Sequence, residues 1–222
     1  MPKHLTIALP NQTQVSGLLD VPTPAKACYV FAHGAGAGME HAFMSAFAGG
    51  LKKRGISSLR FQFPCMEHRF KRPDPPAAAR AAVRAAVERA AREMPGLPLF
   101  AGGKSYGGRM TSQAQSIEPL PHVRGLVFLG FPLHPAGKPC ASRADHLAGV
   151  ELPMLFLQGT RDTLAQLDLI SEIAHRLGPR ASLHIVEGAD HSFHVPARSG
   201  RSDEQVRTEM LDVTVNWMKT NA

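Results

Sequence analysis

The sequence predicts an α/β fold: a mostly parallel, twisted sheet of about 7 or 8 strands with helices on both faces. Short apolar runs typical of strands alternate along the chain with longer runs of helical pattern. Most strand-like runs are apolar nearly throughout, as strands are when both faces of a sheet are covered. The 222 residues fit one domain and contain no internal repeat, so we expect a single domain over 1–222.

The first twenty residues resemble a hairpin whose arms read LTIAL and QVSGLLD. The next strand, ACYVFA, leads directly into the glycine-rich run HGAGAG, and the run ISSLRFQF is closed by Pro64. The later strands are short and apolar, and each is bounded by turn-forming residues. The expected strands are residues 5–9, 14–20, 27–32, 56–63, 97–102, 123–129, 153–157 and 182–186.

Helices are expected at 40–54, 75–93, 105–116, 163–177 and 203–219. The segment 75–93 is rich in alanine, which has the lowest entropic cost in a helix. Its charged residues fall four apart and indicate a solvated stripe: Arg80, Arg84, Glu88 and Arg92. The last helix repeats apolar residues at helical spacing, so we expect these to be core: Val206, Met210, Val213 and Trp217.

The net charge of +7 attracts polyanions and acidic substrates at long range. No zinc-ligand spacing, RNA-binding aromatic block or basic zipper region accompanies it, so we interpret it as a solvated surface and expect no nucleic acid partner. Three scattered cysteines, Cys28, Cys65 and Cys140, do not form a disulfide framework and suit a reducing compartment. With no secretory h-region and no apolar run long enough for a membrane span, we expect a cytoplasmic protein.

Residues Gly103–Gly107 match the pattern G-x-S-x-G, directly after an apolar strand and before a helix. In this context the pattern is typical of a nucleophilic serine on a tight, strained turn, which here is Ser105. The helix N-terminus behind the serine stabilises developing negative charge. Two alternatives are a plain glycine-rich turn and a phosphate-binding loop, but the latter needs a glycine where Pro98 stands.

The general base is expected in the loop after the last strand, where His191 follows SLHIV. The acid is expected after an earlier strand, and Asp162 follows PMLFL. An aspartate there orients the histidine and fixes its tautomer, although it is also a favoured helix cap. His194 and Asp190 are the competing residues; we favour His191 because of its place in the loop and Asp162 because neighbouring side chains rarely face each other.

An acyl-transfer site also needs backbone N–H groups that bind the oxyanion. We assign them to Tyr106, which follows the serine, and to Ala35 in HGAGAG, with Gly36 as the alternative. The loops 63–73 and 131–135 are expected to wall the pocket. The first is basic, which suits either an anionic substrate group or plain solvation. The expected substrate-binding residues are Gly36, Phe63, Met66, Phe131 and Leu133.

The run HGAGAG also resembles part of a dinucleotide fingerprint, but Met39 stands where the third glycine is needed. No acidic residue follows on the next strand, where Arg60 and Gln62 stand. We therefore expect no dinucleotide, and neither a metal nor an organic cofactor. Cys65 has no helix start behind it and no neighbouring histidine in sequence, so we interpret it as inert.

Taken together, the motifs HGAGAG, LRFQFP, GGKSYGGRM, FLGFPLHPAGKP, LQGTRD and GADHSF follow the order seen in small α/β-hydrolases. Over residues 27–195 the chain resembles the cap-less KANL3/Tex30-type group, which is similar to dienelactone hydrolases. The resemblance implies an α/β-hydrolase fold without a large cap domain and the triad Ser105, Asp162 and His191. Ser105 stands where dienelactone hydrolases carry a cysteine.

These observations lead us to expect a carboxylesterase that acts on small acyl esters through an acyl-enzyme. The same triad also serves a thioesterase, a lactonase or a peptidase, and residues alone do not separate them. A third class is a non-catalytic binding module, which the basic charge and the chromatin-associated relatives of the group suggest. The expected partner is a small-molecule ester, and the sequence leaves monomer and homodimer open.

Overall fold

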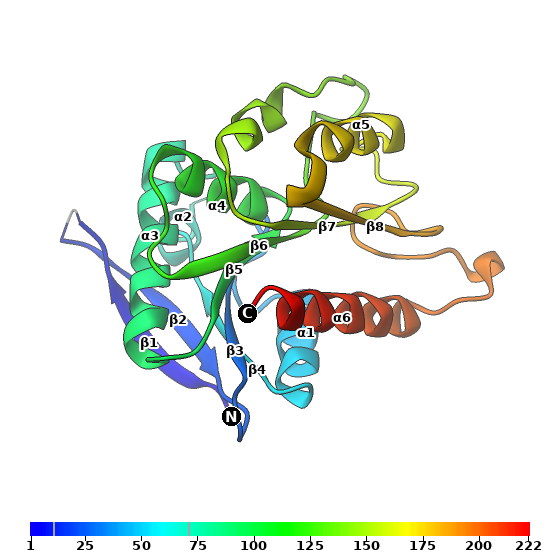
Figure 1. Cartoon of the computed structure of the whole chain (residues 1–222). Coiled ribbons are helices and arrows are strands. Elements are labelled where there is room, and N and C mark those ends of the chain that lie inside the picture. Colours follow the sequence, from blue (N-terminus) through cyan, green and yellow to red (C-terminus); the bar gives the residue numbers. More distant parts are fainter. Residues whose placement is uncertain (11, 71) are drawn as a thin grey trace.

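An 8-stranded sheet runs through the part of the chain that the computed structural model describes, residues 1–10, 12–70 and 72–222. Its order is β1-β2-β4-β3-β5-β6-β7-β8 (Figure 1). The pairs β1–β2 and β2–β4 are antiparallel, and all other pairs are parallel. The strands are β1 Lys3–Ala8, β2 Gln14–Asp20, β3 Ala27–Ala32, β4 Ile56–Phe61, β5 Leu99–Lys104, β6 Val123–Leu129, β7 Met154–Gly159 and β8 Ala181–Val186. The predicted mostly parallel sheet is confirmed.

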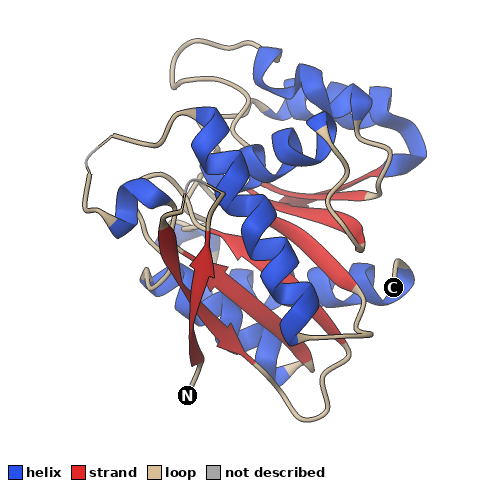
Figure 2. Ribbon diagram, turned by 90° about the vertical axis from the view of Figure 1, so that its left-hand side faces the viewer, coloured by secondary structure: helices blue, strands red, loops and turns tan. Residues whose placement is uncertain are grey.

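Helices cover both faces of this sheet (Figures 1 and 2). Helices α1 and α6 pack on each other and cover one face, and α3, α4 and α5 cover the other. Over the described part of the chain, no large cap domain is added to these layers (Figure 1). The helices are α1 Ala42–Lys53, α2 Pro64–Glu67, α3 Pro76–Glu93, α4 Tyr106–Ile117, α5 Leu167–Leu177 and α6 Asp203–Thr220; the 3-10 segments are η1 Ser142–Gly149, η2 Gly178–Arg180 and η3 Ala197–Ser199.

Strand β3 shows why the central strands are apolar throughout. All six of its residues are buried, and successive side chains point to opposite faces of the sheet. Cys28 and Val30 join the hydrophobic cluster under α3 and α4, whereas Tyr29 and Phe31 join the cluster under α1 and α6. A strand with a core on each side has no solvent face on which to carry polar residues.

The closing helix α6 begins at a capping box in which Ser202 and Gln205 bond each other's backbone amides. Its buried face is wider than the predicted spacing indicates. Val206 and Met210 are buried as expected, and Leu211 also enters the core. The predicted core residues Val213 and Trp217 are only half-buried and pack against the edge of the cluster.

Three local features differ from the prediction. Helix α5 begins at Leu167 instead of 163, because the Asp162 side chain accepts a hydrogen bond from the Leu164 amide and holds a turn there. Neither α2 nor η1 was expected. The charged stripe on α3 is not only a solvated face, since the Arg84 guanidinium donates to the carbonyls of Ala114, Glu118 and Pro119 at the end of α4.

In the described ranges, no helix combines the length and the apolar character needed to cross a bilayer.

Candidate active site

Three parallel strands end at one edge of the sheet, and a residue of the predicted triad follows each of them. Ser105 follows β5, Asp162 lies in the turn after β7, and His191 lies in the loop after β8. Because parallel strands present their carboxyl ends on the same side, these residues converge although they are far apart in sequence.

Ser105 occupies the sharp turn between β5 and α4, with φ 51° and ψ −115°. This conformation is unfavourable for a residue with a side chain, and it is held by the hydrogen bond from the Ser105 amide to the Leu129 carbonyl at 3.0 Å. The flanking glycines leave no room for a Cβ atom. At Gly103 and Gly107 it would lie 2.3 Å and 2.5 Å from the Ala32 carbonyl oxygen. The backbones of β3, β5 and α4 meet there directly.

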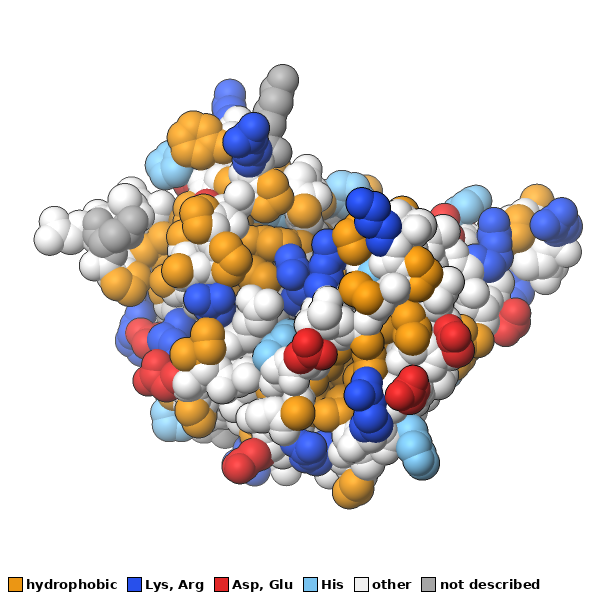
Figure 3. All heavy atoms as spheres, turned by 90° about the horizontal axis from the view of Figure 1, so that it is seen from above, with side chains coloured by type: hydrophobic (Ala, Val, Ile, Leu, Met, Phe, Trp, Pro, Cys, Tyr) orange, Lys and Arg blue, Asp and Glu red, His pale blue; other side chains and the backbone are white. Residues whose placement is uncertain are grey.

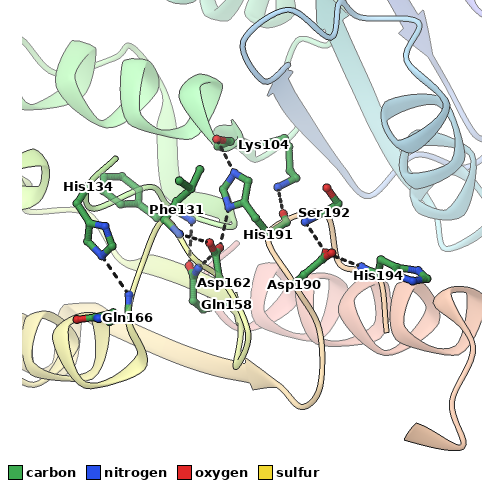
Figure 4. A network of polar contacts seen from close by, with 12 residues as sticks. Lys104, Phe131, His134, Gln158, Asp162, Gln166, Asp190, His191, Ser192 and His194 are labelled. Carbon is green, nitrogen blue, oxygen red and sulfur yellow. Dashed lines mark hydrogen bonds and ion pairs between the residues drawn. The ribbon is translucent and has the colours of Figure 1, made fainter. Parts of the chain in front are cut away.

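An unbroken hydrogen-bond chain joins the three side chains, and Figure 4 shows His191 and Asp162 pointing toward each other in it. The Ser105 Oγ lies 2.8 Å from His191 Nε2, and His191 Nδ1 lies 2.7 Å from Asp162 Oδ2. A carboxylate only accepts, so Nδ1 carries the hydrogen and Nε2 presents its lone pair to the serine hydroxyl. The Asp162 side chain is 0% exposed, which shields this bond from water.

Gln158, the penultimate residue of β7, holds the acid in place and was not singled out from the sequence. Its side-chain N–H donates to Asp162 Oδ2 at 2.5 Å, and its Oε1 accepts the Phe131 amide at 3.0 Å. The Leu164 amide donates to the other carboxylate oxygen at 2.8 Å. The sequence signal that could have identified Gln158 is its polar side chain near the end of an otherwise apolar strand.

Lys104, the residue before the nucleophile, ties the histidine loop to the sheet (Figure 4). Its ammonium donates to the His191 carbonyl oxygen and lies 5.0 Å from the centre of the Phe193 ring. Burial lowers the pKa of Lys104 to about 8, and the nearby carboxylates of Asp162 and Asp190 oppose this shift. The pattern G-x-S-x-G leaves this position unspecified, so the motif gave no signal for it.

The competing residues lie outside the hydrogen-bond chain. Asp190 Oδ1 accepts the amides of Ser192 and His194, which closes the loop on itself. His194 is exposed and pairs with Asp203 at 2.9 Å, and that carboxylate raises the pKa of His194. Burial and the nearby Asp74 raise the pKa of the Cys65 thiol, which disfavours the reactive thiolate.

The amides assigned to the oxyanion lie beside the serine. Tyr106 is the first residue of α4, so its N–H has no acceptor within the helix. Ala35 and Gly36 are exposed in the loop after β3, and within the described residues no acceptor takes the Ala35 amide. Below them, the buried His33 lies 2.7 Å from the Gly34 carbonyl and accepts the Phe63 amide. This imidazole fixes the loop, and burial lowers its pKa.

A pocket of about 390 Å³ opens at Ser105 and His191. Its remaining wall is mainly apolar and consists of Gly34, Ala35, Ala37, His41, Phe43, Met44, Lys104, Leu164 and Ser192. The structure corrects the predicted lining. Phe63, Phe131 and Leu133 are fully buried and pack in the core below the site, where the Phe131 ring meets the rings of Phe128 and Phe156 edge to face. Met66 and Gly36 lie outside this lining, and Lys71 of the predicted basic wall lies outside the described residues.

The described residues contain no group of three or more His, Cys, Asp or Glu side chains arranged to hold a metal ion.

Comparison with known proteins gives the same fold. A family model described as "Alpha/beta hydrolase domain" matches residues 25–219. A dienelactone hydrolase from Anabaena variabilis superposes with a TM-score of 0.78 at 19% identity, covering 100% of this chain and 98% of that one. A lidless α/β serine hydrolase from Xanthomonas campestris gives 0.75 at 20% identity, covering 97% and 94%. A cold-adapted esterase from an Arctic intertidal metagenome gives 0.71 at 20% identity, covering 99% and 93%.

Proposed function

This chain belongs to the α/β-hydrolase family, and from that premise we propose that it is a serine hydrolase that cleaves small carboxylic esters. Its catalytic residues are Ser105, His191 and Asp162. The observation that carries the proposal is the continuous hydrogen-bond chain from the Ser105 hydroxyl through His191 to the buried Asp162 carboxylate. A hydroxyl in strained backbone and an imidazole with a fixed tautomer are what nucleophilic attack requires.

In the first half of the reaction, Ser105 Oγ attacks the ester carbonyl carbon while His191 Nε2 takes the hydroxyl proton. The carbonyl oxygen becomes an oxyanion, which the amides of Tyr106 and Ala35 bind. The intermediate then collapses: the bond from carbon to the alcohol oxygen breaks, and His191 returns its proton to that oxygen. The alcohol leaves, and the acyl group stays on Ser105.

The second half repeats these steps with water. His191 removes a proton from the water, and the water oxygen attacks the acyl carbon. The bond between that carbon and Ser105 Oγ then breaks, His191 returns the proton to Oγ, and the carboxylic acid leaves. Throughout, the Asp162 carboxylate stabilises the imidazolium, and Gln158 and the Leu164 amide keep that carboxylate in position. The pocket of about 390 Å³ favours a small, mainly apolar acyl or alcohol group.

A fluorophosphonate probe tests the proposal directly, because it labels only an activated serine. We expect rapid labelling of the wild-type protein. The Ser105→Ala variant should have the same melting temperature as the wild type but should not be labelled. A panel of 4-nitrophenyl esters, thioesters, lactones and peptides then separates the bond types that one triad can cleave. A folded, monodisperse wild-type sample that neither labels nor hydrolyses any of these would refute the proposal and favour a binding module.

A further inference from the structure

Two arginines lie side by side on the elements next to the nucleophile. Ser112 of α4 and His146 of η1 are joined by a hydrogen bond of 2.8 Å. Arg109 and Arg143 each precede these residues by three positions. The two helices run in the same direction here, because Ser116 lies beside Gly149 further along both of them, with its Oγ 3.5 Å from where a Cβ of Gly149 would be. Arg109 and Arg143 therefore occupy neighbouring positions on the two helices, one turn before the bonded pair.

Among the residues that the structure describes, neither guanidinium has an anionic partner. Most of the other buried or partly buried arginines pair with acids, as Arg60 does with Asp20 and Arg84 does with Glu118. Within the described residues, no carboxylate lies within 4.0 Å of Arg109 or Arg143.

The Arg109 Nε is buried and has no hydrogen-bond partner among the described residues. Burial and repulsion by the Arg143 guanidinium lower the pKa of Arg109. Two like charges held together without a counter-ion are destabilising, and an anion between them would relieve that repulsion.

Arg109 lies close to the nucleophile. Arg109 is one helical turn after Ser105, and its amide donates to the Ser105 carbonyl at 3.1 Å. Its guanidinium lies 5.9 Å from the centre of the Tyr106 ring, and Tyr106 also supplies the candidate oxyanion amide. A rise of about 1.5 Å per residue places Arg109 about 6 Å along the helix from the serine. Neither arginine lines the apolar pocket at Ser105, whose wall comes from other loops.

An ester has two parts, and both extend from the carbon that the serine attacks. If one part occupies the apolar pocket, the second part extends away from that pocket. We propose that Arg109 and Arg143 bind an anionic group, a carboxylate or a phosphate, on this second part of the substrate. The inference rests on the proposed function, because it places the anion on the molecule cleaved at Ser105.

The surface supports this assignment. On the face seen in Figure 3, Lys and Arg side chains lie beside a hydrophobic hollow near the middle of the view. A guanidinium presents a planar fork of donors that matches the oxygens of carboxylate and phosphate. The net charge of +7 draws such anions toward the molecule at low ionic strength.

The test compares two esters of similar length: 4-nitrophenyl butyrate, which is neutral, and mono(4-nitrophenyl) succinate, whose acyl group ends in a carboxylate. We expect the ratio of their kcat/KM values, anionic over neutral, to fall about tenfold or more in Arg143→Gln and in Arg109→Gln. Arg124→Gln, at an exposed arginine near the start of β6, is the matched control and should keep the wild-type ratio.

A second measurement does not need turnover. Titration calorimetry measures the binding of monomethyl succinate and of methyl phosphate to the Ser105→Ala variant. Comparing the two affinities distinguishes a carboxylate site from a phosphate site. Adding Arg143→Gln to that variant should lower its affinity for whichever anion binds. Raising the salt concentration should lower that affinity further.

Equal kcat/KM ratios in the wild type and both arginine variants, or anion binding that survives loss of Arg143, would overturn the inference. Failure of the proposed function is a different result, in which the fluorophosphonate probe does not label the folded wild type. The calorimetry still decides whether the arginine pair binds anions in that case.

Discussion

Replacing Gly159 with alanine should move His191 away from Asp162 while leaving both side chains unchanged. Gly159 ends β7, and a Cβ atom there would lie 2.3 Å from the Ala189 carbonyl oxygen and 2.9 Å from that of Asp190. These carbonyls belong to the loop that carries His191. Because both neighbours are backbone atoms, the loop itself must move to admit the methyl group.

The required displacement follows from the contact distances. Ordinary contact to a Cβ begins at 3.4 Å, so the loop must retreat by about 1.1 Å, the difference between 3.4 and 2.3 Å. The bond between His191 Nδ1 and Asp162 Oδ2 is now 2.7 Å, and a shift of that size breaks it. A misplacement of about 1 Å in a catalytic site costs roughly 100-fold in rate, and overpacking costs about 1–3 kcal/mol of stability.

We therefore expect Gly159→Ala to lower kcat/KM for 4-nitrophenyl butyrate, and the rate of fluorophosphonate labelling, by about 100-fold. Urea unfolding at the same pH measures the loss of stability and shows whether the variant is folded. Gly49→Ala is the matched control, since a Cβ at Gly49 on α1 meets nothing within 4 Å. A folded Gly159→Ala variant with wild-type kcat/KM would refute the contact argument.

Three further predictions concern buried charges. Asp162→Asn should keep the fold but lower kcat by about 10⁴-fold, because the amide selects the wrong tautomer of the histidine; a folded variant with near-wild-type kcat would contradict the triad. Lys104 has its pKa lowered from 10.5 to about 8, so between these values the unfolded chain holds a proton that the folded protein has lost. Stability should thus rise with pH over that window by roughly 3 kcal/mol, and urea unfolding of Lys104→Met should lack the rise. Arg60→Met should lower the free energy of unfolding by up to about 3–5 kcal/mol, because the buried Asp20 carboxylate, now 3.0 Å from the guanidinium, keeps only the Lys52 ammonium at 4.0 Å. Asp20→Asn in the same background should restore part of that loss, and an unchanged urea midpoint in Arg60→Met would count against the ion pair.

Much of the architecture was predictable because local physics sets it. Apolar runs such as ACYVFA form strands buried on both faces, and an alanine-rich segment between prolines forms a helix. Boundaries were less predictable. The start of α5 at Leu167 depends on the Asp162 carboxylate bonding the Leu164 amide, a contact that propensity does not encode.

The candidate site divides in the same way. Ser105, Asp162 and His191 each follow a strand, so strand positions and the parallel order were enough to expect them at one edge. The pocket wall was not predictable. Phe63 and Phe131 resemble lining residues in sequence but are buried below the site, and the wall comes instead from residues such as Phe43 and Leu164.

The sequence by itself therefore determined which elements form and which residue types stand at the strand ends, because those depend on neighbours in the chain. Only the tertiary structure decided which side chains contact the reacting atoms. Gln158 bonds Asp162 within one turn, and Lys104 bonds the His191 carbonyl from a distant part of the chain. Arg109 and Arg143 come near each other only because η1 packs against α4. Such contacts depend on distances of a few ångströms in the packed molecule, and residue order does not specify them.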